Sequence, residues 1–521
     1  MIRQLTPLVL AAAIATLPAQ ARTLRYASVG DVRTMDPHGL YETFTQATLA
    51  SIYEGLVRMN ERLELEPSLA LSWENPEPEL WRFRLRPGVR FQDGTPFTAD
   101  DVVFSFARAA TEGSDLKVPV ATVREVRAVD PLTVEITTRG PNPILPREIV
   151  FLGMMSRAWA ERVGATAPVD IRQQRENFAT RNANGTGPFR LALREPDSRT
   201  VFAVNPDWWD TPRHNLTEVI FRPIANAPTR VAALLSGELD LMEPVPVQDI
   251  PRVSATPGLR VLEGPEMRTV FLGMDQSRAE LTDSPLRGRN PFQDLRVRQA
   301  VLLATDAQAI HQTIMRRQSR VAGLILGPGV EGYDSALDTR PAVDIAQARR
   351  LMAEAGLADG FEVGLDCPND RLVNDQAICT SLVSMLARIN IRVVPNIRPR
   401  AQWGQKVLSR NTSFYLQSWS TPTYDAFNPI VSLLAAPRDG RGTFNSGGYE
   451  NARIEALIPR IQQETNPTAR RAMIGEVLGI HRDEVGHIPL HQQFLAWGAR
   501  SNVTTPLMPD NVIKLYLTRI E

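Results

Sequence analysis

The stretch "WRFRLRPGVRFQDGTPFTADDVVFSF", residues 81–106, holds the clearest local pattern in the chain. Trp81, Phe83 and Leu85 alternate with arginines, which is the period-2 pattern of a half-buried strand. Pro87-Gly88 then turns the chain into "VRFQDG", so we predict a half-buried hairpin with a solvated basic face. Arginines interleaved with aromatics also occur in nucleic-acid sites, but the alternation explains every residue of this stretch without one.

Two features flank this strand. Upstream, the acidic stretch "ENPEPE" (74–79) can neutralise the basic face. Downstream, Thr98 is followed three residues later by Asp101, a capping-box arrangement that predicts the start of a helix in "TADDVVFSFARAA".

Helices and strands alternate irregularly along the rest of the chain. Strands are predicted at "TVEITT", "RTVFAV", "EVIFRPI", "FEVGLD" and "FYLQSW", and helices at 295–315, 344–356 and 375–390, the second closed by a left-handed cap at Gly356. Such a mixture is α/β or α+β with several sheets. With 521 residues, the chain is too long for one core, so we expect two or three domains.

The composition is that of a folded soluble protein, with 43% apolar and 22% charged residues. Lys plus Arg and Asp plus Glu number 58 each, so no net field draws the chain to nucleic acid or anionic lipid. Nucleic acid is therefore not an expected partner.

The first 21 residues, "MIRQLTPLVLAAAIATLPAQA", have the order of a signal peptide: a basic start, an apolar stretch and a small-x-small cleavage site. No Cys follows that site, so we do not expect a lipoprotein. No later stretch reaches about 18 uninterrupted apolar residues. We predict export and a periplasmic location.

Cys367 and Cys379 are the two cysteines of the chain. In an exported protein they predict a disulfide that closes a loop of about 13 residues, the alternative being two buried free thiols. The intervening residues hold no His and no CxxC spacing, which argues against zinc.

Motifs for catalysis are missing from the sequence. There is no GxSxG elbow, HExxH or Walker A loop. His481, His487 and His491 lie close together, but Pro489 breaks the helix that could align them, so we interpret them as ordinary histidines in a helix end and a following strand. We predict no catalytic residues, no metal, no cofactor and no enzyme activity.

Several blocks resemble one family in order. They are "SIYEGLVRMNERLELEPSLALSWE" (51–74), the 81–106 stretch, "NGTGPFRL" (184–191), "VNPDWW" (204–209), "RVAALLSGELDL" (230–241), "FQDLRVRQAVLLATD" (292–306), "DIAQARRLMAEAGLADGFE" (344–362) and "FNSGGYENARIEAL" (444–457). Together they look like the dipeptide/oligopeptide solute-binding proteins of ABC importers (cluster C, extracellular solute-binding family 5).

The resemblance implies a two-lobed periplasmic binding protein, a type II Venus flytrap of cluster C with an extra subdomain on lobe I. Lobe I is expected at 22–60, 180–267 and 486–521, the extra subdomain at 61–179, and lobe II at 268–485. Two crossing strands near 266–274 and 486–493 are expected to form the hinge. A monomer that captures a peptide or peptide-like solute by hinge closure and delivers it to an inner-membrane ABC permease is implied.

Peptide-binding relatives hold the α-amine on the Asp of a GWxxD motif. Here Ser418-Trp419 begins the matching stretch, and Pro422 stands at the Asp position. Either Asp425 replaces that acid, or the solute lacks an α-amine. Arg371 lies close to the place of the family's carboxylate-binding Arg.

Further candidate contacts follow from the same resemblance and from the preference of pockets for aromatic walls. The full set of ligand-binding candidates is Met35, His38, Tyr41, Asn369, Arg371, Trp403, Trp419, Ser420, Thr421, Tyr424 and Asp425.

Other functions remain open. The same fold and transport role with a non-peptide ligand, such as an opine, a sugar derivative or a chelate, is the first alternative. A secreted hydrolase would need a nucleophile or metal set, and a periplasmic chaperone would need broad apolar exposure.

Overall fold

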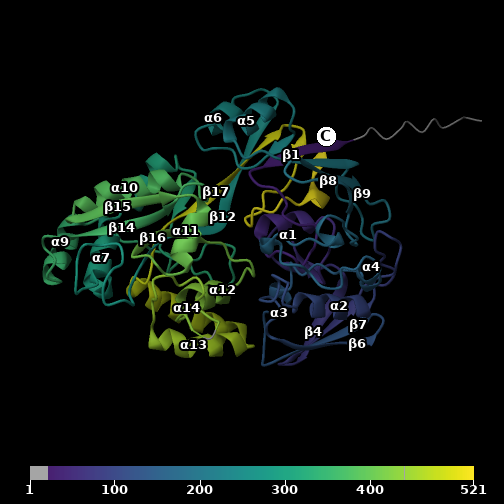
Figure 1. Ribbon diagram of the computed structural model, residues 1–521, viewed down its shortest axis with the longest axis horizontal. Coiled ribbons are helices and arrows are strands. Elements are labelled where there is room, and N and C mark those ends of the chain that lie inside the picture. Colours follow the sequence, from purple (N-terminus) through teal and green to yellow (C-terminus); the bar gives the residue numbers. More distant parts are fainter. Residues whose placement is uncertain (1–21, 439) are drawn as a thin grey trace, which may run out of the picture.

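The computed structural model describes residues 22–438 and 440–521 (Figure 1). The predicted signal peptide, residues 1–21, lies outside the described residues. Among the helices of the described part, none combines the length and the apolar character needed to cross a membrane.

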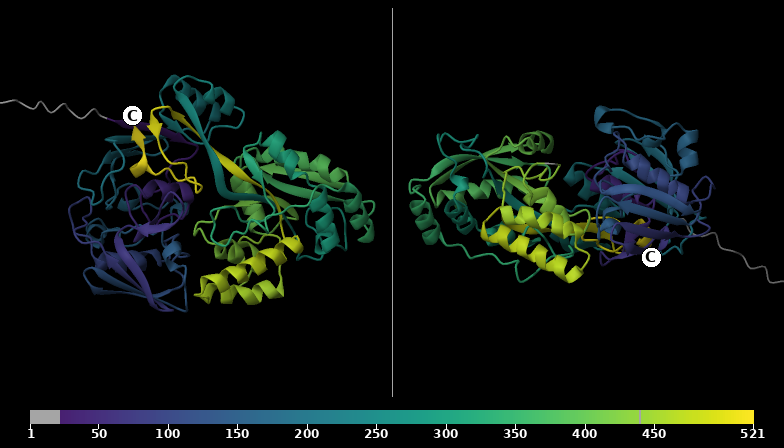
Figure 2. Two further views of the ribbon diagram at one scale, coloured as in Figure 1. Left: turned by 180° about the vertical axis from the view of Figure 1, so that it is seen from behind. Right: turned by 90° about the horizontal axis from the view of Figure 1, so that it is seen from below.

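One long sheet runs through both lobes. Its order is β15 (Ile391–Arg398), β14 (Phe361–Pro368), β16 (Phe414–Trp419), β12 (Leu259–Met274), β17 (Ile488–Arg500), β11 (Leu241–Met242), β1 (Thr23–Ser28), β10 (Glu218–Pro223), β9 (Arg199–Val204) and β8 (Phe189–Glu195), with β13 (Ser319–Val321) paired to β17. The antiparallel strands β12 and β17 pass from one lobe to the other (Figures 1 and 2). They lie where the sequence predicts the hinge.

The register of β12 changes at the middle of the strand. Leu259–Pro265 pairs with the later part of β17 and Thr269–Leu272 with its earlier part, while Thr269–Met274 also pairs with β16 of lobe II. A register shift lies between Pro265 and Thr269. Bulges bend strands and increase their twist. Residues 266–268 therefore lie at the point where the two lobes join.

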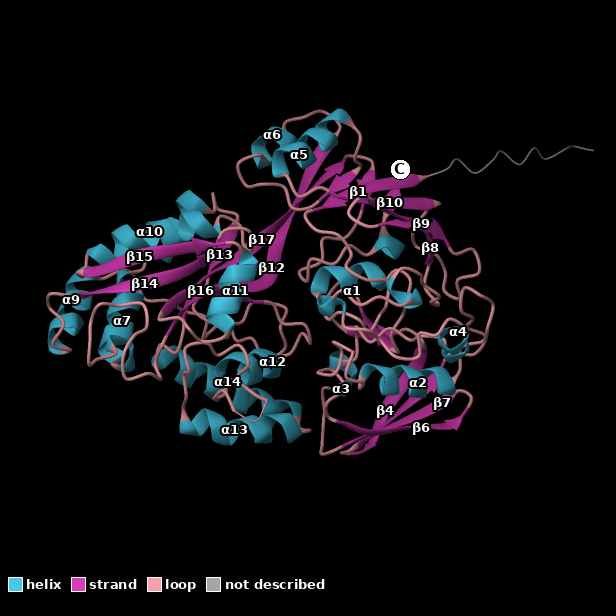
Figure 3. Ribbon diagram, viewed as in Figure 1, coloured by secondary structure: helices cyan, strands magenta, loops and turns pink. Residues whose placement is uncertain are grey.

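Lobe II surrounds its part of the sheet with helices (Figure 3). They are α7 (Leu295–Ala304), α9 (Ile345–Glu354), α10 (Asp375–Ala387) and α11 (Arg400–Leu408), while α13 (Ala452–Gln463) and α14 (Pro467–Asp483) form a separate layer. Lobe I adds α1 (Thr43–Leu49), α5 (Ala227–Ser236) and α6 (Ile250–Ser254).

The extra subdomain is a four-stranded antiparallel sheet of β4 (Ala70–Glu77), β5 (Leu80–Leu85), β7 (Thr133–Thr138) and β6 (Val123–Asp130), packed on α2 (Ala99–Ala109). The predicted alternation is confirmed: Trp81, Phe83 and Leu85 are buried. The capping box of Thr98 and Asp101 is also present.

The predicted hairpin partner is wrong. Strand β5 pairs with β4, which contains part of the acidic stretch, and with β7 rather than with "VRFQDG". Glu74 lies opposite Arg82, and the Arg82 guanidinium donates to Glu74 at 3.1 Å and to Glu135 at 2.8 Å. The acidic stretch thus neutralises the basic face as a neighbouring strand.

The helix predicted at 295–315 is interrupted. Helix α7 ends at Ala304 because Thr305 is extended, and Asp306 caps a new short helix, α8 (Ala307–Ala309), by accepting from the Ala309 N–H. A capping Asp inside an apolar periodic pattern can start a new helix. The helix predicted at 344–356 agrees with the structure: Asp344 caps α9, and Gly356 follows the helix at φ 71°.

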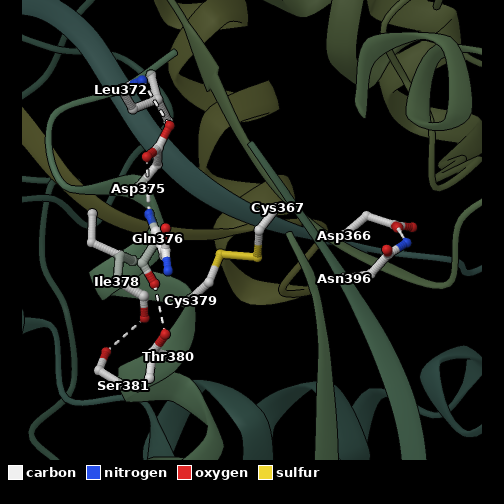
Figure 4. The surroundings of a disulfide bond; sticks show 10 residues. All are labelled: Asp366, Cys367, Leu372, Asp375, Gln376, Ile378, Cys379, Thr380, Ser381 and Asn396. Carbon is white, nitrogen blue, oxygen red and sulfur yellow. Dashed lines mark hydrogen bonds between the residues drawn. A yellow bond between two sulfur atoms is a disulfide. The ribbon is translucent and has the colours of Figure 1, made fainter. Parts of the chain in front are cut away.

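The predicted disulfide is confirmed. Cys367 near the end of β14 is bonded to Cys379 in α10, across a sequence separation of 12 (Figure 4). The loop that it closes carries Asn369 and Arg371. The bond therefore joins a strand end, the predicted site loop and a helix.

Replacing Cys379 by Ser should lower the free energy of unfolding by about 3 kcal/mol, because the unfolded chain regains the entropy of the closed loop. Urea unfolding of the exported protein with and without reductant measures this. An unchanged midpoint in the reduced protein would contradict the expected contribution of the disulfide.

Candidate functional site

Both lobes turn the carboxyl ends of parallel strands toward the hinge. In lobe II, β14 is parallel to β15 and β16, and β16 is antiparallel to hinge strand β12. In lobe I, β1 is parallel to β11, which is antiparallel to hinge strand β17. Because β12 and β17 run in opposite directions, β16 and β11 end at the hinge from opposite sides. Ligands of open α/β sheets bind outside such carboxyl ends.

Arg371 lies in the loop that follows β14. Its guanidinium carbon is 4.6 Å from the centroid of the buried Trp403 ring, and its Nη2 donates weakly to the Ser418 carbonyl at 3.4 Å. None of the described carboxylates forms an ion pair with it. The side chain is a cation held on an aromatic face.

Two buried donors at this place lack acceptors. Arg371 Nη1 and Trp403 Nε1 have no hydrogen-bond partner among the described residues. Burial, together with the positive charges of Arg268 and Arg400, lowers the pKa of Arg371 to about 9, so the group stays charged at neutral pH. Such an arrangement favours an anion, since buried N–H groups without acceptors are costly.

The hinge residues continue this polar cluster. Arg268 Nη1 lies 3.4 Å from the Ser418 hydroxyl, and its Nε donates to the buried Glu266 at 2.9 Å. The Gln493 amide also donates to Glu266. Arg268 is therefore paired, whereas Arg371 is not.

Lobe I places an acid on its side of the hinge. Glu243 follows β11 directly and is 6% exposed. The Ser28 hydroxyl and the Asn511 amide are its hydrogen-bond partners, and burial raises its pKa. The site thus has Glu243 on the lobe I side, Arg371 on the lobe II side and the Glu266–Arg268 ion pair at the hinge.

Asp425, the predicted replacement for the amine anchor, is bound to lobe II itself. Its two oxygens accept from Arg470 at 2.7 and 2.8 Å, and both side chains are buried. Its Oδ1 also accepts from the Phe427 N–H at 2.8 Å. We leave Asp425 out of the proposed site, because its charge is already balanced.

The loop around Asp425, which belongs to lobe II, contacts lobe I and the extra subdomain. The Tyr424 hydroxyl donates to Asp510 of the C-terminal segment at 2.7 Å, and its ring stacks on Phe151 at 6.4 Å. Tyr41 and Glu148 lie nearby, and burial raises the pKa of Glu148 to about 7. The predicted residues Tyr41 and Tyr424 therefore lie at a contact between the lobes.

Trp419 packs within lobe II. Its ring meets Phe444 at a centroid distance of 4.7 Å, and its Nε1 donates to Asn428 at 3.0 Å. Ser420 and Pro422 are half-buried, and Thr421 is buried with its carbonyl accepting from the Tyr424 N–H. These contacts hold the loop without using a solute.

Met35 and His38 lie inside lobe I. Both side chains are fully buried, and the His38 ring bridges the Gly153 carbonyl at 2.9 Å and Arg108 at 3.0 Å. Arg108 is in turn paired with the buried Asp36. We leave both residues out of the proposed site. Asn369, by contrast, is exposed in the Arg371 loop.

The histidines of the C-terminal region are buried core groups. His481 and His487 contact each other at 3.0 Å, and burial lowers the pKa of His487 to about 4. Across residues 22–438 and 440–521, no three His, Cys, Asp or Glu side chains gather as a metal site would require.

Sequence reasoning missed Glu243, Glu266 and Arg268. A signal for Glu243 is present, because this acid directly follows the apolar end of a strand in "LDLME". A cavity lined by Glu54, Ser68, Trp208, Lys514 and Tyr516 was also not predicted; it lies between lobe I and the extra subdomain and contains none of the candidate residues.

Comparison with known proteins gives relatives along the whole chain. The glutathione-binding protein GsiB of Salmonella paratyphi A is 24% identical over 516 residues, covering 97% of this chain and 96% of GsiB. The periplasmic binding protein DppA of Helicobacter pylori, solved with peptide STSA, has a TM-score of 0.78 at 20% identity and covers 96% of this chain and 98% of its own.

AgaA of A. tumefaciens R10, solved with agropinic acid, has a TM-score of 0.77 at 22% identity, covering 96% of this chain and 99% of its own. These similarities confirm the predicted α/β two-lobed binding-protein fold. A profile described as bacterial extracellular solute-binding proteins, family 5 Middle, matches residues 64–440. The chain belongs to the family 5 bacterial extracellular solute-binding proteins.

Proposed function

We propose that this protein is the periplasmic substrate-binding component of an ABC importer and that it captures a peptide or peptide-like solute. Membership of family 5 supports the binding role. The relatives named for glutathione binding and solved with a peptide support the solute class. Export through the first 21 residues, a monomeric state and the absence of enzyme activity are parts of the same proposal.

The main support for this proposal is the pair of buried hydrogen-bond donors on Arg371 and Trp403. The Nη1 of Arg371 and the Nε1 of Trp403 have no acceptor among the described residues, and the arginine has no carboxylate partner. A solute carboxylate would accept from both and balance the charge. In this proposal, the carboxylate end of the solute binds to lobe II.

The hinge explains how binding would close the protein. A solute that contacts both lobes binds the closed state more tightly than the open state, and this difference shifts the population toward closure. A micromolar solute supplies about 8 kcal/mol of binding free energy, enough to shift a modest open–closed equilibrium. A permease would then recognise the closed form.

A non-peptide acid is the second candidate solute. It is favoured by the structural similarity to AgaA, which was solved with agropinic acid. Arg371 and Trp403 would hold the carboxylate of an opine as well as that of a peptide, because neither donor distinguishes the rest of the molecule. The candidates differ in the contacts that the remainder of the solute needs.

A thermal-shift screen separates the two. The mature protein is melted with di- to hexapeptides, glutathione and opines, each at increasing concentration. A true solute at about 100 times its dissociation constant should add roughly 2.7 kcal/mol to stability. If no peptide raises the melting temperature and an opine does, the peptide assignment is wrong; if no acid of either class does, the carboxylate site is wrong.

A further inference from the structure

Glu243 in lobe I, like Arg371 in lobe II, follows the carboxyl end of a strand that belongs to a parallel pair. It follows β11 at the carboxyl end of the parallel pair formed with β1, and its N–H donates to the Ala27 carbonyl at 3.0 Å. Ser28, the last residue of β1, is 4% exposed beside it. Both strand ends are directed at the hinge, and therefore at the other lobe.

The charge of Glu243 lacks a cation in direct contact. Among the described residues, no Lys, Arg or His nitrogen forms an ion pair with it. Arg230 is close enough to favour the ionised form, but its guanidinium donates to the Ile224 carbonyl at 2.6 Å and the Pro244 carbonyl at 3.1 Å. The hydrogen-bond partners of Glu243 are the uncharged Ser28 and Asn511.

A second buried acid lies close to Glu243 and has a cation of its own. Glu266 lies near enough to Glu243 to disfavour its negative charge, yet Glu266 has its own cation in Arg268 at 2.9 Å. Burial of an ionised carboxylate without a cation is costly. Glu243 is therefore the acid of this pair that has no cation in direct contact.

Two other acids of the region, Asp31 and Asp425, have cations in direct contact. Asp31, just after β1, is paired with Arg194 at 2.8 Å. Asp425 is paired with Arg470 at 2.7 Å. The buried Asp510 instead accepts from the Tyr424 hydroxyl. The position of the family's amine-binding acid is Pro422, which carries no charge.

We propose that Glu243 binds a cationic amine of the solute while Arg371 binds its carboxylate. The solute class is then a zwitterion whose charged ends are held by different lobes. This inference rests on the proposed function, since it uses the same site. Its consequence is that neither lobe alone contacts both charged ends, so binding of both ends requires closure.

The test uses one peptide from the thermal-shift screen in two forms, with a free amine and with an N-acetyl group, measured by isothermal titration calorimetry. Acetylation should weaken binding to the unmodified protein by about 30-fold or more. Glu243→Gln should weaken binding of the free-amine form by about 10-fold or more and leave the acetylated form unchanged. Glu238→Gln, a change at an exposed acid in the same segment, is the matched control.

Equal affinity of both peptide forms for the unmodified protein would overturn the inference, and this measurement needs no variant to fold. Free-amine binding that is unchanged in a folded Glu243→Gln protein would overturn it as well. Either result leaves the peptide-binding proposal intact. If no peptide binds the unmodified protein at all, the peptide assignment of the proposed function fails, and the inference fails with it.

Discussion

Replacing Asp425 by Ala is expected to lower the free energy of unfolding by about 3–5 kcal/mol, because it leaves the buried Arg470 without its counter-charge. The two side chains are 1% and 8% exposed and share two hydrogen bonds. Urea unfolding followed by circular dichroism measures the loss. Solute affinity of the protein that remains folded should be unchanged.

A double variant provides the internal control. Asp425→Ala with Arg470→Met should recover part of the stability, because no unpaired charge is left buried. Asp483→Ala, at an exposed ion pair with Arg482, should change stability by less than about 1 kcal/mol. If Asp425→Ala keeps full stability and loses solute affinity, Asp425 is a solute anchor and the structural assignment is wrong.

Replacing Arg371 by Ala is expected to cost about 2–5 kcal/mol of binding free energy, a loss of roughly 30-fold or more in affinity. The guanidinium is the cation that we propose binds the solute carboxylate, and it packs against the face of the Trp403 ring. Calorimetric titration with the best solute of the thermal-shift screen measures the change.

Arg392→Ala is the matched control for this variant. Arg392 lies on neighbouring strand β15, is largely exposed and pairs with Glu362. Its removal should leave affinity unchanged. Equal affinity losses in the two variants would indicate a general effect of positive charge instead of a contact at Arg371.

Much of the fold could be predicted because its signals are local. The alternation at Trp81–Leu85, the cap at Thr98 and the disulfide between residues 12 apart all depend on short stretches. The wrong prediction of the hairpin concerns which strands pair with each other. Strand β5 pairs with β4 and β7, and a local pattern does not state which strand will lie beside another.

For the candidate site, too, the sequence indicates single residues but not their distant partners. Arg371 was found through its resemblance to a family position, and the structure gives it an aromatic support and an unpaired charge. Asp425 looked available because its partner Arg470 is 45 residues away. Glu243 was missed because its surroundings, Ser28, Asn511 and Glu266, come from distant parts of the sequence that the fold brings together.

The assignment of the solute carboxylate to Arg371 is tested most directly by comparing a peptide with its C-terminal amide, on the unmodified protein and on Arg371→Ala. Amidation should weaken binding to the unmodified protein by about 30-fold or more, and Arg371→Ala should bind both forms equally. The two losses are then not additive, because both remove the same contact. Strictly additive losses, or full affinity of the amide for the unmodified protein, would contradict the assignment of the solute carboxylate to Arg371.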